Sequence, residues 1–141
     1  MAAERGQVAR GKWFQERAAS ALAEHYGVSF LCDEPVSIGS LAKEHRFDFV
    51  SVDRTHVGDC MNYSWTKSGN VPSAKMGFVN QAVFFLSFLP ESVNRFVVLR
   101  RDYSRERGES LAHYYHRTYK HLLRGVGVLE PDTDSGRLRE L

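Results

Sequence analysis

Cysteine is scarce in this chain. Only Cys32 and Cys60 occur among its 141 residues, and neither belongs to a CxxC pair. Two cysteines are too few for a disulfide framework, so we expect buried free thiols in a reducing compartment. No apolar run approaches the roughly 20 residues needed to cross a bilayer, and the first residues lack the apolar segment of a secretory signal. We therefore expect a cytoplasmic protein without a membrane partner.

The chain also lacks a strong excess of charge of either sign. Its 19 basic and 17 acidic residues give a net charge of +2 and a pI of about 8.6. This mild basicity neither requires nor excludes a nucleic-acid partner. Its length is typical of one domain that can bury a core without disulfides or metals.

The hydrophobic pattern predicts an α/β domain. Helical spacing covers 7–26, 74–89 and 109–123, and strand-like runs cover 28–36, 47–52, 57–65, 95–100 and 126–130. Gly27 is expected to end the first helix, and Pro72 to precede the second. The order αβββαβαβ gives a mixed central sheet flanked by helices, in one domain over 1–130. The loop-like composition of 131–141 predicts a flexible tail.

Two aspartates are expected on a predicted hairpin. Asp48 lies in "FDFV" and Asp59 in "VGDCMNY", with one turn between the two strands. Facing residues of paired antiparallel strands lie within roughly 5 Å, so both carboxylates can reach one divalent cation if they share a face. Such an ion can polarise a phosphoryl oxygen and lower the pKa of an attacking water.

These residues, with the element order and the following "SWTKSGNVPSAK", resemble the PD-(D/E)xK nuclease superfamily of the restriction-endonuclease-like fold. The resemblance runs from the first helix to Glu130. It implies a nuclease that hydrolyses phosphodiester bonds with Mg²⁺ or Mn²⁺ bound by Asp48 and Asp59. Glu16 matches, more weakly, an acid that many members carry on the first helix. The resemblance also implies a nucleic-acid substrate, with DNA preferred, and a homodimer as one option for assembly.

The chain departs from this family at Met61, where the motif carries its catalytic lysine. Methionine offers no charge and no donor, and losing one such group typically costs about a hundredfold to a thousandfold in rate. Lys67 and Lys75 are candidate substitutes. Lys75 is preferred, because it starts the second predicted helix, from which some family members are thought to supply the lysine.

The last predicted helix carries a basic stripe. At about 100° per residue, His113, Arg117, Lys120 and Arg124 fall on one side. We consider Arg117, Lys120 and Arg124 as candidates for phosphate contact, although an ordinary solvated face is slightly favoured.

Three hypotheses therefore remain at the level of sequence. The first is a metal-dependent endonuclease-like enzyme, impaired at Met61. The second is a catalytically degenerate nuclease fold that serves as a nucleic-acid-binding or assembly module. The third is an interaction domain with no nucleic-acid role.

Overall fold

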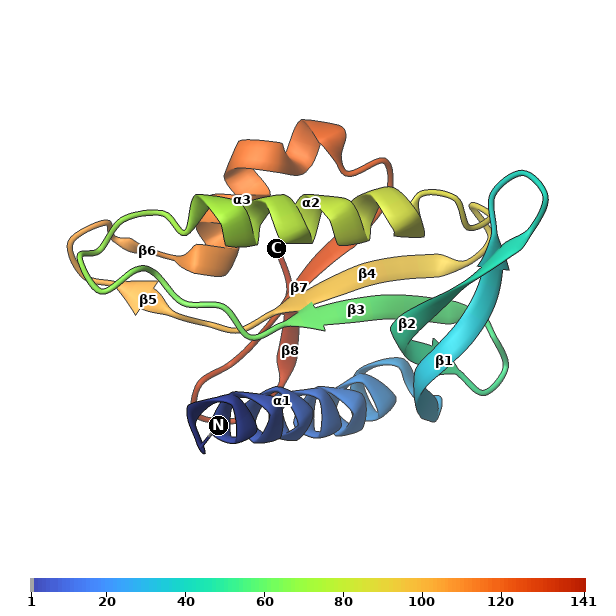
Figure 1. Cartoon of the computed structure of the whole chain (residues 1–141), viewed down its shortest axis with the longest axis horizontal. Coiled ribbons are helices and arrows are strands. Elements are labelled where there is room, and N and C mark those ends of the chain that lie inside the picture. Colours follow the sequence, from blue (N-terminus) through green and yellow to red (C-terminus); the bar gives the residue numbers. More distant parts are fainter. Residues whose placement is uncertain (1) are drawn as a thin grey trace.

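The computed structural model describes residues 2–141, with side chains described from residue 10 onward. It contains a six-stranded mixed sheet of order β1-β2-β3-β4-β7-β8 (Figure 1). These strands are β1 (Phe30–Ile38), β2 (Lys43–Ser51), β3 (His56–Met61), β4 (Asn94–Leu99), β7 (Gly127–Pro131) and β8 (Leu138–Glu140). β3, β4 and β7 are parallel, whereas β1, β2 and β8 join as antiparallel strands. The expected α/β class with a mixed sheet between helices is confirmed.

The helices form two layers on the sheet. α1 (Ala2–Tyr26) covers one face, and α2 (Ser73–Leu86) and α3 (Leu111–Tyr119) cover the other (Figure 1). β4 separates two apolar cores, because Phe96 and Val98 pack toward α1 while Val97 and Leu99 pack toward α2 and α3. α1 ends where Gly27 adopts a φ of 71°, as its sequence position predicts. α2 begins directly after Pro72, as also expected.

The polar segment 37–46, expected to be a connection, is mostly strand. β1 and β2 form a long hairpin that turns only at residues 39–42. Its outer half carries many exposed polar residues and therefore lacks the hydrophobic alternation that predicts a strand. The pairing continues on both sides of Asp33 and Asp48 but skips these two residues, and Asp33 has a φ of 55°. The hairpin is thus irregular at Asp48.

The second half of the chain differs from expectation in smaller ways. β3 ends at Met61 rather than 65, and the segment expected as a charged connection contains a small hairpin of β5 (Tyr103–Ser104) and β6 (Glu109–Ser110). α3 ends at Tyr119 and passes into a 3₁₀ turn, η1 (Lys120–Leu122). This change of helical pitch buries Leu123 and leaves Leu122 57% exposed.

The tail expected to be flexible contains β8. Leu138 is buried against the α1-side core, and the backbone of Leu141 bonds to Val128. Glu130, fully buried on β7, accepts hydrogen bonds from Arg139 of β8 at 2.7 Å, from Arg101 at 3.0 Å and from the Ser110 hydroxyl. Loop composition alone missed this strand because a buried carboxylate, rather than an apolar pattern, holds it.

None of the described helices combines the length and the apolar character required to span a bilayer.

Candidate functional site

Asp48 and Asp59 exchange hydrogen bonds across neighbouring strands. The backbone N–H of Asp48 donates to Oδ1 of Asp59 at 2.8 Å, and the backbone N–H of Cys60 donates to Oδ2 of Asp48 at 2.9 Å. Regular pairing of β2 with β3 runs only through Val50–Val57 and Phe49–Gly58. The two carboxylates therefore bind backbone groups at the point where the strand ladder ends.

The two side chains approach this point from different sides of the sheet. Asp59 lies beside Val97 in the parallel register, between Val57 and Met61, which pack with the α2-side core. Asp48 instead lines a pocket beneath α1, together with Cys60. Strand alternation therefore does not place the two carboxylates on one face as expected, because the irregularity at Asp48 interrupts that alternation. The two acids come together instead through the hydrogen bonds at the end of the strand ladder.

Burial and mutual charge change the protonation of the pair. Asp59 is only 8% exposed, and burial followed by the charge of Asp48 raises its pKa to about 7. Burial also raises the pKa of Asp48, although the N–H of Cys60 opposes this shift. Two neighbouring carboxylates are costly to hold ionised together, and a proton or a bound cation relieves that cost.

The pocket beneath α1 has a volume of about 450 Å³ and combines acidic, amide and lysine groups. Lys12 and Gln15 of α1 line it opposite Asp33, Asp48 and Asn62. The Gln15 side-chain amide donates to Asp33 Oδ1 and to the Asp48 backbone carbonyl, each at 3.2 Å. Gln15 therefore joins α1 to the irregular part of the hairpin, and Lys12 brings a positive charge to the pocket that contains Asp48.

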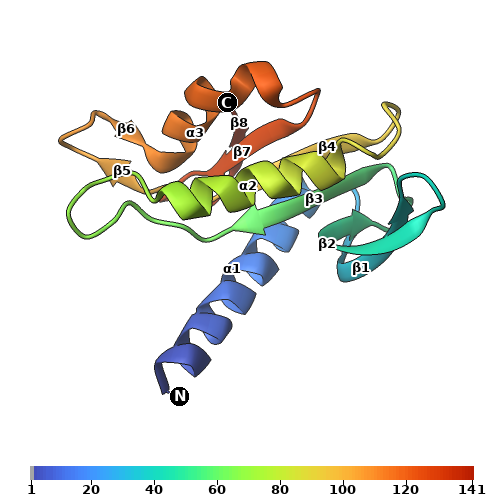
Figure 2. The ribbon, with the colours of Figure 1, turned by 45° about the horizontal axis from the view of Figure 1, so that its top comes forward.

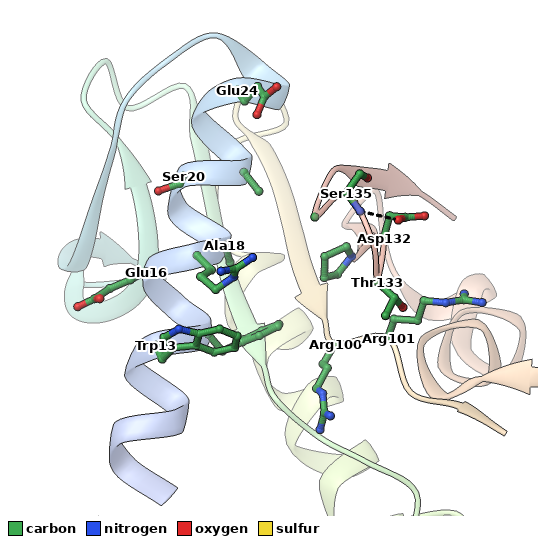
Figure 3. Close-up of a pocket in the computed structure, with 15 residues that line it drawn as sticks. Trp13, Glu16, Ala18, Ser20, Glu24, Arg100, Arg101, Asp132, Thr133 and Ser135 are labelled. Carbon is green, nitrogen blue, oxygen red and sulfur yellow. Dashed lines mark hydrogen bonds between the residues drawn. The ribbon is translucent and has the colours of Figure 1, made fainter. Parts of the chain in front are cut away.

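The other residues that the family resemblance brings into question, at position 61, Lys75 and Glu16, lie in different surroundings. Met61 is half-buried against the α2-side core. The Lys75 amine lies over the rings of Tyr63 and Phe78, at 5.1 and 5.9 Å from their centroids. Glu16 of α1 is among the residues that line a cleft on the other flank of this helix (Figure 3), and its charge, after burial and the charges of Asp33 and Asp48, contributes to a raised pKa of Cys32. Glu16 therefore lies between that cleft and the acidic groups around Cys32.

A second cleft of about 760 Å³ lies on the other flank of α1 (Figure 3). Its walls come from α1, from the residues after β4 and from the β7–β8 turn. Trp13 is 59% exposed, and the Arg17 guanidinium lies 4.8 Å from its ring centroid. Arg100 follows the carboxyl end of β4, the edge at which open α/β sheets commonly bind ligands. Phe14 lines both this cleft and the Asp48 pocket, so the two are neighbours.

The basic stripe predicted on the last helix lies elsewhere. α3 covers the face opposite α1, as a second view also shows (Figure 2). Arg117 forms a bidentate pair with Glu109 at 2.7 and 2.8 Å. Lys120 and Arg124 are exposed, Arg124 just before the turn to β7. The stripe and the Asp48 pocket are therefore separated by the sheet.

Sequence reasoning missed Lys12, Gln15, Asp33 and Asn62. Lys12 and Gln15 were not identified because the sequence of a helix that packs on a sheet is interpreted mainly from its apolar positions. Asn62 follows Cys60 by two residues and so points to the same side of the strand. It could have been predicted if Cys60, rather than Asp59, had been assigned to the side of the sheet that carries Asp48.

Among the side chains that the structure describes, those of residues 10–141, no group of three or more from His, Cys, Asp or Glu is close enough to hold a metal ion by protein ligands alone. Any cation at Asp48 and Asp59 would need water or substrate as further ligands. No protein-family model matches the chain, and searches of curated proteins and of solved structures also found no match.

Proposed function

We propose that the chain is a divalent-cation-dependent, nuclease-like protein that hydrolyses phosphodiester bonds in nucleic acid. The observation that carries the proposal is the hydrogen-bonded pair of Asp48 and Asp59 at the point where β2 and β3 stop pairing. Burial and the charge of Asp48 raise the pKa of Asp59 to about 7. A bound cation would offset the repulsion between the two carboxylates, which favours cation binding.

The chain offers a donor set that suits Mg²⁺ or Mn²⁺. Although the two side chains come from different sides of the sheet, they meet where the β2–β3 ladder ends, and each carboxylate gives one oxygen to a backbone N–H there, which leaves its other oxygen for a hard cation. A bound ion would polarise the phosphoryl oxygen and activate water. Because two protein carboxylates leave most coordination positions to water and substrate, we expect weak cation binding that tightens with nucleic acid. Glu16 is a candidate third acid, although it lines the neighbouring cleft rather than the Asp48 pocket.

A catalytic role requires a lysine in place of the one that Met61 replaces, and Lys12 is the best-placed lysine. It shares a pocket with Asp48, whereas Lys75 lies over two aromatic rings. We propose that Lys12 offsets charge on the scissile phosphate. Arg17, Arg100 and the exposed Trp13 ring, on the neighbouring flank of α1, would contact the backbone and bases of a bound strand.

A cleavage assay tests this proposal. Labelled single- and double-stranded DNA and RNA are incubated with Mn²⁺ or Mg²⁺ and with the wild type, Asp48→Asn, Lys12→Ala and Lys75→Ala. We expect cleavage that is lost in Asp48→Asn and reduced about a hundredfold in Lys12→Ala, but little changed in Lys75→Ala. Equal cleavage by wild type and Asp48→Asn would rule out the proposed site.

A second function, binding of nucleic acid without cleavage, is favoured by Met61. Its half-buried side chain packs with the apolar core where the family motif would place a lysine. Metal-independent binding by the wild type, with no product after long incubation, would establish this alternative. Such binding should weaken steeply with salt, because phosphate contacts release counterions.

A further inference from the structure

α2 exposes an unusually apolar stripe. Phe78, Phe84 and Phe88 are 49, 57 and 48% exposed, and Ala74, Gly77 and Gln81 are exposed between them. At about 100° per residue these positions fall within roughly 60° of Gln81, on the side opposite the buried residues Met76, Val79, Val83 and Leu86. α2 is therefore apolar on both sides, which is typical of a helix covered by a partner.

Large and small residues of this stripe are distributed about its centre. The bulky Phe84 and Phe88 stack edge to face at the C-terminal end of the stripe, with ring centroids 5.0 Å apart, and Phe88 lies in the turn directly after α2. The N-terminal half holds the small residues Ala74 and Gly77 together with Phe78, and no atom lies within 4 Å of a Cβ built on Gly77. Gln81 is midway between positions 74 and 88. Reversing one copy of this helix about Gln81 places Ala74 of one copy opposite Phe88 of the other and Phe78 opposite Phe84, with Gly77 leaving room between these aromatic side chains.

The charges at the two ends fit the same arrangement. Lys75 is exposed near the start of α2, and Glu91 is exposed just after its end. Neither side chain forms an ion pair with another described residue. An antiparallel pair brings each lysine toward the partner's acid end and opposes the helix dipoles, whereas a parallel pair brings like charges together.

We infer that the occupant of this stripe is a second copy of the chain, bound through α2 about a two-fold axis at Gln81. A two-fold interface uses one self-complementary patch on both subunits, and this stripe matches itself in size and in end charge. Phe84 and Phe88 then pack over the Gly77 notch of the partner, and the Gln81 side chains meet at the axis. The inference does not depend on the proposed nuclease activity, since α2 and the Asp48 pocket lie on opposite faces of the sheet.

Sedimentation velocity over a wide concentration range tests the inference. We expect a wild-type monomer–dimer equilibrium and at least a tenfold higher dissociation constant for Phe84→Lys. Val52→Lys is the matched control, because Val52 is 62% exposed in the turn between β2 and β3, away from α2. Circular dichroism verifies that each variant is folded. A wild type that stays monomeric, or a Phe84→Lys variant that dimerises equally well, would overturn the inference.

Cysteine cross-linking tests the orientation separately, with Cys32→Ser as the background because Cys32 is exposed, contrary to the expectation of a buried thiol. Gln81→Cys should form a disulfide between subunits on mild oxidation, since residues at the axis face each other. Ala74→Cys should not, because antiparallel helices separate the two copies of position 74 by about 21 Å along the axis. Equal cross-linking at both positions would indicate a parallel pair and contradict the assignment.

Discussion

The backbone N–H of Asp48 donates to Oδ1 of Asp59 at 2.8 Å. Asp59, one of the two proposed cation ligands, therefore also fixes the backbone at Asp48, the other proposed ligand. The N–H of Cys60 completes the exchange by donating to Asp48 Oδ2 at 2.9 Å. The pair is therefore structural as well as acidic. Replacing either aspartate with asparagine keeps an acceptor oxygen for these bonds and removes only the charge, which makes asparagine the informative substitution.

The first prediction concerns the pH dependence of stability. The pKa of Asp59 is raised from 3.8 to about 7, so the folded state holds a proton that the unfolded state releases between these pH values. Stability from this group is therefore highest in acid and falls as the pH rises through this window, by roughly 2–3 kcal/mol between pH 5 and pH 8. Asp59→Asn should remove this fall, as urea unfolding at both pH values would show.

A control for that experiment is Asp53→Asn. Hydrogen bonds from Thr55 and Ser51 lower the pKa of Asp53 to about 2, the opposite direction. Removing that carboxylate should leave the decline of stability toward pH 8 in place. A wild-type protein whose stability does not fall between pH 5 and pH 8, relative to Asp59→Asn, would contradict the raised pKa.

The second prediction concerns the buried carboxylate of Glu130. Burial alone would raise its pKa, but hydrogen bonds from Ser110, Arg139 and Arg101 outweigh burial and lower it. Glu130→Gln leaves two arginines without their acid and should destabilise the protein by about 3–5 kcal/mol, measured by urea unfolding at pH 7. Glu34→Gln, at the exposed Arg54 pair, should cost less than about 1 kcal/mol. Similar losses of stability in both variants would contradict a larger contribution from the buried Glu130 cluster than from the exposed Glu34–Arg54 pair.

The third prediction tests packing at the centre of the sheet. A Cβ on Gly58 of β3 would lie 2.2 Å from the Phe96 ring. Gly58→Ala should therefore destabilise by about 1–3 kcal/mol, and Phe96→Leu in the same chain should recover part of that loss. Gly11→Ala is the control, because no atom lies within 4 Å of its added Cβ in α1, and it should stabilise by up to about 1 kcal/mol. Additive losses for Gly58→Ala and Phe96→Leu would contradict direct contact.

The fourth prediction separates two basic surfaces. Arg17→Ala, beside the Trp13 ring, and Arg100→Ala, in the same cleft, should weaken binding of a labelled single-stranded oligonucleotide and reduce its salt dependence. Lys120→Ala and Arg124→Ala, on the opposite layer, should have little effect. Fluorescence anisotropy at several salt concentrations measures both. A larger loss from the second pair would move the binding surface to the α3 side.

The sequence predicted the regular parts of the fold because they follow simple physical rules. The φ > 0 position at Gly27 and the entry at Pro72 mark helix ends, and the apolar run before Arg100 identifies the central strand β4. The outer halves of β1 and β2 and all of β8 were missed. Side-chain hydrogen bonds and cross-strand pairing hold these segments, and neither leaves a hydrophobic period.

The candidate site was predicted in part. The closeness of Asp48 and Asp59 followed from a hairpin with one turn between them. The side of the sheet from which each aspartate approaches could not be predicted in this way. The irregularity at Asp33 and Asp48 is a property of tertiary packing rather than of local periodicity. Lys12 reaches the same pocket only because α1 crosses the end of the hairpin.

Calorimetric titration of Mn²⁺ at pH 8, into the wild type and into Asp48→Asn and Asp59→Asn, tests the central proposal most directly. We expect a single weak site in the wild type, absent from both variants, and a wild-type free energy of unfolding that rises with Mn²⁺, because a bound cation offsets the paired charge. Equal heats in all three proteins, or none in any of them, would contradict a cation site at Asp48 and Asp59.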